Sequence, residues 1–132
     1  NPYLSVATIS THDMAPMRLW WQERPEVAQH YYLHRMQKEG RAPTTLTTTL
    51  AEEIVSRHLY SPSMLCLISL QDWLAVDTEM RNPDPRAERI NIPGDCYNRW
   101  SYRMHVNIEQ LLTAEPLNKK LKTMIERSKR NV

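Results

Sequence analysis

The chain has 132 residues, with 17 Lys or Arg against 15 Asp or Glu and a formal net charge of +2. This near balance of charges gives no electrostatic indication of nucleic-acid binding. No apolar run reaches the roughly 18 residues of a membrane helix. No secretory signal is visible and the two cysteines form no Cys-x-x-Cys pair, so we expect reduced thiols and a cytoplasmic protein. The first residue is Asn1 instead of Met, which suggests a piece of a longer protein.

The first half of the chain predicts one strand followed by helices. Residues 3–9 are apolar and β-branched, which is typical of a short strand. A helix is expected to begin near Ala15, because Pro16 suits a first helical turn. Two more helices are predicted, one over residues 25–39 and one over residues 46–59, where apolar residues recur at helical spacing.

The second half repeats the pattern of a strand followed by helices. The apolar run 64–70 predicts a buried strand, and residues 72–76 a short helix after it. Residues 81–95 contain three prolines, one glycine and few apolar residues, and this composition predicts a long loop of the kind that often carries function. Two final helices are expected, one around residues 104–112 and one from Pro116 onward.

This order predicts a mainly α fold with two short strands. Strands separated by a long helical segment fit βα crossover units and pair in parallel. Two parallel strands cannot satisfy their own edges, so either further strands lie outside this chain or the piece packs as a mainly helical body. Unpaired strand edges would also favour self-association of such a piece.

Both predicted strands end in polar residues with a carboxylate. His12 and Asp13 follow the first strand, and Gln71 and Asp72 follow the second. Each Asp has two interpretations, either as the cap of the next helix or as a functional group at the carboxyl end of a strand. Spacing alone favours the cap for Asp13 and leaves Asp72 undecided, but in a βα barrel both ends would share one face.

Two other groups of residues have chemical potential. His30 and His34 share a helix face, and together with His12 and Asp13 they offer a metal-binding alternative, although surface histidines are far commoner. The loop 88–95 and the aromatic and basic residues after it suit sugars, because aromatic rings stack on sugar faces while amides and guanidinium groups bond hydroxyls. The alternative is a loop held by buried aromatics.

Three segments together resemble the 4-alpha-glucanotransferases, also called amylomaltases or disproportionating enzymes. The resemblance lies in Ser10–Met14 followed by Arg18–Trp21, in Leu70–Leu74, and in Glu88–Gly94 followed by Trp100–Arg103. One such motif alone would be weak, but the ordered set is specific. Two departures are Ser69, where that family often has proline, and Tyr102, where it has a second tryptophan.

The resemblance implies a (β/α)8 barrel that transfers α-1,4-glucan segments by a retaining double displacement, without a metal or other cofactor. Its substrate would be a maltodextrin, starch or glycogen chain. Asp13 matches the carboxylate that stabilises the transition state, and His12 would bond the same sugar. The remaining matched residues imply substrate contacts at Gln71, Asp72, Asn91, Trp100 and Arg103.

The same resemblance places the nucleophile and the acid/base upstream of this chain. Residues 1–132 would then be the C-terminal portion of the barrel, namely its last two βα units, with terminal helices from about residue 104. We therefore expect the isolated chain to be inactive. A different class of function, a helical carbohydrate-binding or protein-interaction module without catalysis, is the alternative.

Overall fold

The computed structural model describes residues 2–130 as a mainly helical chain with two short strands. This confirms the predicted composition of the fold. The elements in chain order are β1 (Val6–Thr8), α1 (Met17–Glu23), α2 (Pro25–His34), α3 (Thr48–Leu59), β2 (Leu65–Leu67), α4 (Leu70–Leu74), the 3-10 helix η1 (Pro85–Glu88), α5 (Ile108–Thr113) and α6 (Glu115–Arg127). None of the helices within residues 2–130 has the length and apolar character needed to cross a membrane.

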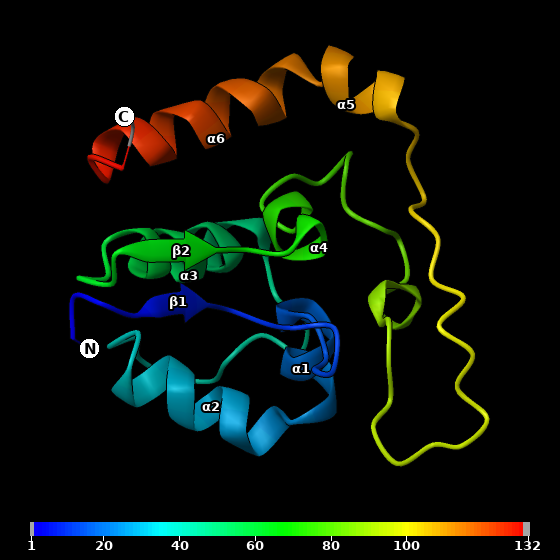
Figure 1. Ribbon diagram of the computed structural model, residues 1–132. Helices are drawn as coiled ribbons and strands as arrows, with labels where there is room; N and C mark the ends of the chain where they lie inside the picture. The colour runs from blue at the N-terminus through cyan, green and yellow to red at the C-terminus, as the bar shows by residue number, and fades with distance from the viewer. Residues whose placement is uncertain (1, 131–132) are drawn as a thin grey trace.

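The two strands pair in parallel, as the crossover pattern predicted. Val6 pairs with Leu65 and Thr8 with Leu67. Figure 1 shows both strands running in the same direction, with α2 and α6 beyond opposite edges of the pair. Both strands end on the side where α1, α4 and the long segment 89–107 lie.

The prediction of a buried strand over residues 64–70 is wrong in length and in burial. Strand β2 has only three residues, because Ser69 caps α4 and its side chain accepts a hydrogen bond from the Asp72 N–H. Leu65 and Leu67 are 47% and 60% exposed. Alternate residues of a strand lie on the same face, so these leucines project from one face of β2, which is largely uncovered. Among the described residues β2 is paired along one edge only.

The second helix is shorter than predicted. Helix α2 ends at His34, because the N–H groups of Arg35 and Met36 both bond the Tyr31 carbonyl and Gln37 adopts a left-handed backbone with φ 55°. The periodicity of residues 25–39 contained no signal for this stop. The first helix likewise begins slightly later than predicted, at Met17, directly after Pro16.

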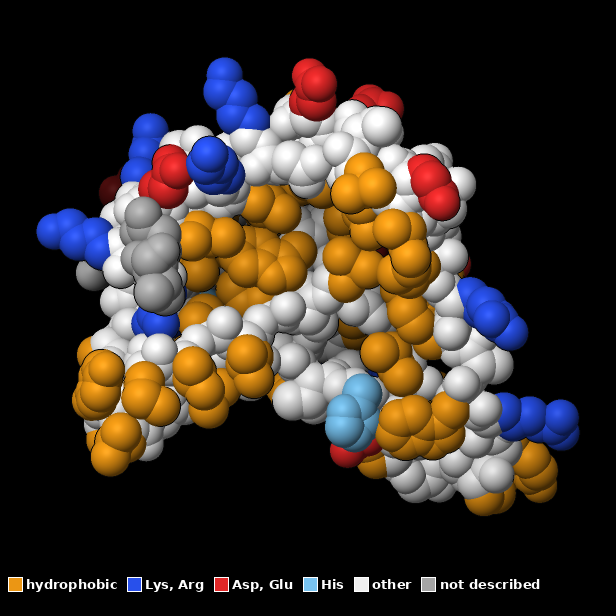
Figure 2. Space-filling model, turned by 45° about the horizontal axis from the view of Figure 1, so that its top comes forward, with side chains coloured by type: hydrophobic (Ala, Val, Ile, Leu, Met, Phe, Trp, Pro, Cys, Tyr) orange, Lys and Arg blue, Asp and Glu red, His pale blue; other side chains and the backbone are white. Residues whose placement is uncertain are grey.

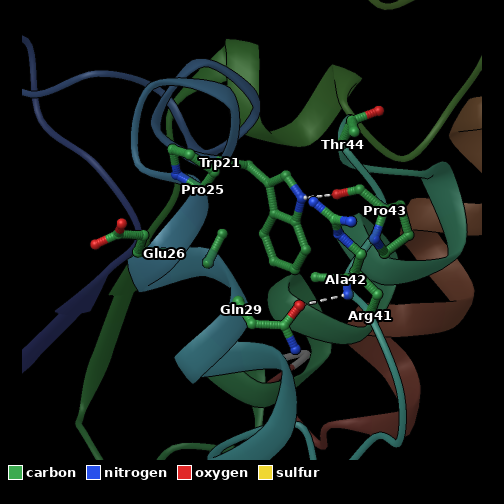
Figure 3. A pocket seen from close by; sticks show the side chains of 9 residues that line it. Trp21, Pro25, Glu26, Gln29, Arg41, Ala42, Pro43 and Thr44 are labelled. Carbon is green, nitrogen blue, oxygen red and sulfur yellow. Dashed lines mark hydrogen bonds between the residues drawn. The ribbon is translucent and has the colours of Figure 1, made fainter.

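Trp21 is central to the helical core. It is 1% exposed, and its indole N–H donates to the Pro43 carbonyl at 2.8 Å. Figure 3 shows the ring between α2 and the segment that carries Ala42 and Pro43. Gln29 on α2 accepts a hydrogen bond from the Ala42 N–H at 2.8 Å, so the returning segment is fastened on both sides of the ring.

The carboxylate of Asp72 joins the ends of both strands to the start of α1. Ser10 after β1 and Ser69 after β2 both donate side-chain hydrogen bonds to Asp72 Oδ2. The N–H of Met17 donates to Asp72 Oδ1 at 2.8 Å, so Asp72 caps α1 from a different helix. Asp72 is 0% exposed. A carboxylate this deeply buried is tolerated because donors surround both of its oxygens.

A second buried carboxylate fastens η1 to α1. The Arg18 guanidinium on α1 lies 2.8 Å from Glu88 Oε1 and also donates to the Asn82 carbonyl at 2.8 Å. Arg18 is 7% and Glu88 2% exposed. Burial raises the pKa of Glu88 to about 7, although the neighbouring Arg18 acts in the opposite direction. The predicted loop 81–95 is therefore anchored in the interior at this point.

We expect Asp72→Ala to destabilise the fold by about 3 kcal/mol, because it leaves two buried donors and one part-buried donor without their charged acceptor. Urea unfolding of the chain measures this change. The matched control is Asp84→Ala, which removes an exposed carboxylate that caps η1, and it should cost no more than about 1 kcal/mol. Equal losses for the two variants would contradict the role assigned to Asp72.

We also expect Glu88 to make stability depend on pH. Because its pKa is about 7 in the folded chain and 4.5 ordinarily, the folded state holds a proton that the unfolded state has released. The Glu88 contribution is therefore complete below pH 4.5 and is lost as the pH rises toward 7. Urea unfolding across this range should give a smaller fall in the free energy of unfolding for Glu88→Gln than for the wild type. Parallel curves for the two proteins would contradict this expectation.

Candidate functional site

The turn after β1 meets the segment after η1 through Asn91. The Asn91 N–H donates to the His12 carbonyl at 3.1 Å. Its side-chain amide donates to Asp13 Oδ1 at 2.6 Å. Residues far apart in the sequence, at a strand end and in the proline-containing segment, are thus joined by one backbone and one side-chain hydrogen bond. Three of the predicted site residues lie together here.

Trp100 adds an aromatic ring to this group. Its ring centre is 5.3 Å from that of His12, with an angle of 44° between the planes. Trp100 is 57% exposed and has a left-handed backbone with φ 52°. A non-glycine residue in this region carries strain of about 1–3 kcal/mol, and such residues concentrate at functional sites. We call His12, Asp13, Asn91 and Trp100 the strand-end cluster.

The polar groups of the strand-end cluster are open to solvent. The side chains of His12 and Asp13 are 58% and 50% exposed, and His12 Nε2 lies 3.4 Å from Asp13 Oδ2. One carboxylate oxygen is held by the Asn91 amide, which leaves the other facing the imidazole and solvent. An exposed carboxylate, an imidazole and an aromatic face together can bond the hydroxyls of a polyol and pack against its apolar surface.

Asp13 does not cap the following helix, so the cap interpretation favoured by spacing is wrong for this residue. Pro16 is the N-cap residue of α1, and no side chain of its own segment caps the helix. The Met17 N–H instead bonds Asp72, which comes from the other strand end. The Asp13 carboxylate is therefore not used in capping, and its contacts are those within the strand-end cluster.

Gln71 and Asp72, the residues after the second strand, are buried and do not belong to the strand-end cluster. They are 5% and 0% exposed, and Gln71 donates to the Glu88 carbonyl at 3.2 Å. Both side chains therefore support the surrounding backbone. Arg103 is exposed, and none of the hydrogen bonds found within residues 2–130 links its side chain to the strand-end cluster.

Two residues beside the strand-end cluster were not singled out individually by the sequence. Asn98 donates to the side-chain oxygen of Asn91 and so orients the Asn91 amide toward Asp13. Its only sequence signal was its place in a segment rich in polar and aromatic residues. Glu88 belongs to a motif quoted above, but a charged residue in a loop gives no indication that it will be buried against Arg18.

The metal-binding alternative gains no support from this geometry. His30 and His34 lie with ring centres 4.3 Å apart on α2. Within residues 2–130, no three or more His, Cys, Asp or Glu side chains come together as a group able to hold a metal ion.

The chain is similar to known proteins over most of its length. A family model described as 4-alpha-glucanotransferase matches residues 1–109. The 4-alpha-glucanotransferase of Chlamydia muridarum is 35% identical over 126 residues, which cover 94% of this chain and 23% of that protein. The 4-alpha-glucanotransferase of Chlamydia trachomatis serovar D is 32% identical over 123 residues, covering 92% of this chain and 23% of that protein.

A plant protein shows the same relation. The 4-alpha-glucanotransferase DPE2 of Oryza sativa subsp. japonica is 29% identical over 129 residues, covering 98% of this chain and 14% of that protein. The chain therefore spans between 14% and 23% of the length of these three relatives. Since the family model matches most of its residues, the chain belongs to the 4-alpha-glucanotransferase family.

Proposed function

We propose that residues 1–132 are the C-terminal portion of the catalytic barrel of a 4-alpha-glucanotransferase that acts on maltodextrin, starch or glycogen chains. The parallel pairing of β1 and β2 across an intervening helical segment supports this, because βα barrels are built from such units. The strand-end cluster supports it as well, since barrel enzymes carry their chemistry at the carboxyl ends of their strands.

The uncovered face of the two strands is a third support for a barrel portion. Val6 is 52% exposed, and Leu65 and Leu67 project from the same face. Figure 2 shows hydrophobic side chains gathered around a hollow on one face of the molecule, with a histidine at its lower rim. Apolar strand residues in a complete barrel pack against the other strands, so the strand face that carries Val6, Leu65 and Leu67 fits a contact with further strands of the enzyme.

The hydrogen bond between Asn91 and Asp13 is the observation that carries the proposed chemistry. It holds an exposed carboxylate in a fixed orientation at a strand end, as expected for a group that stabilises positive charge as it develops. We assign Asp13 to the stabilisation of the oxocarbenium-like transition state and to hydroxyl binding. His12 would bond the same sugar through its imidazole.

The other residues that the family resemblance implied as substrate contacts have different roles in this proposal. Trp100 offers its exposed face to a sugar ring, and Asn91 orients Asp13. Gln71 and Asp72, being buried, act through the backbone that they hold. Arg103, which is exposed, is assigned to glucan binding on the family resemblance alone.

The proposed reaction needs two more carboxyl groups. In a retaining transfer, one carboxylate attacks the anomeric carbon while the glycosidic bond breaks and its oxygen takes a proton from the other carboxyl group. That second group then deprotonates the acceptor hydroxyl, whose oxygen attacks the anomeric carbon and releases the first carboxylate. We place both groups in portions of the enzyme outside this chain. Residues 1–132 would contribute stabilisation and binding, and the chain alone would not transfer glucan.

The chain alone is expected to form no longer maltodextrins from maltotriose, because it lacks the nucleophile and the acid/base. Chromatography of the products after prolonged incubation tests this. The positive control is the protein encoded by the longest reading frame that contains the chain. Transfer by the chain alone would overturn the proposed division of roles. Binding of maltodextrin without transfer by either protein would favour a carbohydrate-binding module.

In the protein encoded by that longest reading frame, Asp13→Asn should lower kcat by about 100- to 1000-fold with little change in KM, because the lost charge acts mainly in the transition state. Initial rates of glucose release from maltotriose measure this. The control is Asp84→Asn, which alters an exposed carboxylate but keeps a residue able to cap η1. A change confined to KM would contradict the role proposed for Asp13.

A further inference from the structure

The buried Arg18–Glu88 ion pair lies outside the strand-end cluster and has no part in the proposed chemistry so far. Withdrawing two charges from water costs several kcal/mol per ion, and a buried pair is therefore weak evidence for stability. Gln71 adds a hydrogen bond to the Glu88 carbonyl at 3.2 Å. Glu88 is thus held through both its side chain and its backbone.

The segment 88–91 connects this anchored residue to the strand-end cluster. Glu88 is fixed at its start by Arg18, at 2.8 Å. Asn91 at its end donates its N–H to the His12 carbonyl at 3.1 Å and its side-chain amide to Asp13 at 2.6 Å. So few residues separate the two fixed points that a movement of Glu88 must be passed on to the Asn91 side chain.

We infer that Glu88 is a positioning residue for the transfer reaction. Paired with Arg18, it holds the segment 88–91 in the one placement in which the Asn91 amide orients the Asp13 carboxylate. This inference rests on the proposed function for its catalytic consequence. Its structural part, the dependence of Asn91 on Glu88, stands on geometry alone.

The surroundings of Glu88 make this placement sensitive to pH. Arg18 on α1, Asp72 on α4, Arg81 and Tyr102 are the ionisable groups that interact with it. Glu88 Oε2 is buried and has no hydrogen-bond partner among the described residues. Burial raises the pKa of Glu88 to about 7. The ionic attraction to Arg18 is therefore complete only above this pH. Protonation below it removes the cost of burying the charge, and so favours folding, but it weakens the specific attraction by which Arg18 holds segment 88–91.

The structural part is tested by NMR on the chain itself, through the side-chain amide signals of Asn91. These signals are identified by their loss in Asn91→Ala. Glu88→Gln should shift them, whereas Glu53→Gln, which changes an ion-paired carboxylate on α3, should not. In a His12→Gln background they should move with pH with a midpoint near 7, and this movement should vanish when Glu88→Gln is added.

A pH titration that leaves Glu88 in place decides the question even where Glu88→Gln does not fold. It is run in a His12→Gln background, so that the imidazole beside Asp13 cannot itself move the Asn91 signals. Asn91 signals that stay constant across neutral pH would overturn the inference. So would signals that move identically in the His12→Gln chain and in a folded chain that also carries Glu88→Gln.

The effect of Glu88 on catalysis is tested in the protein encoded by the longest reading frame that contains the chain. Glu88→Gln should lower kcat by about 100-fold, the loss expected when a reacting group is misplaced by about an ångström. In an Asn91→Ala background it should cause little further loss, because both substitutions break the same connection. Additive losses would overturn the positioning role. If the wild type transfers no glucan, the proposed function itself fails, and the Asn91 signals still decide whether Glu88 holds this residue.

Discussion

The arrangement of the chain depends on a single buried carboxylate between two strand ends. Asp72 receives hydrogen bonds from Ser10 and Ser69, which follow the two strands, and from the Met17 N–H at the start of α1. A charge at this depth is acceptable only while all these donors are present. The position of β1 relative to β2 and the direction in which α1 leaves are therefore fixed together.

The strand-end cluster is a consequence of this constraint. Because Asp72 caps α1, the neighbouring Asp13 is released from that role and faces solvent, where Asn91 holds one of its oxygens. The segment that carries Asn91 is in turn fastened to α1 through Arg18 and Glu88. In the function proposed above, these contacts fix a carboxylate at a strand end, where it can stabilise a developing sugar cation.

The sequence predicted which residues meet better than it predicted how they are arranged. The parallel pairing of the strands followed from their separation by a helical segment. The family resemblance, and not the strand-end pattern, named Asn91 and Trp100 beside His12 and Asp13 as sugar contacts, and the structure brings these four residues together. The sequence did not show that Asp72, and not Asp13, caps α1. Spacing indicates that a helix start needs a hydrogen-bond acceptor, but it does not show which element supplies that acceptor. The burial of Glu88 was equally hidden, since a loop charge and its partner on α1 lie far apart in sequence.

The same long-range contacts determine when the site can form during folding. Ser10 and Asp72 are 62 positions apart, and Asp13 and Asn91 are 78 positions apart. Closing loops of this length costs chain entropy before any contact is gained, whereas α1, α2 and α3 rely on local hydrogen bonds. We therefore expect these contacts to form late, so that the strand-end cluster is complete only once nearly the whole chain has reached its final arrangement.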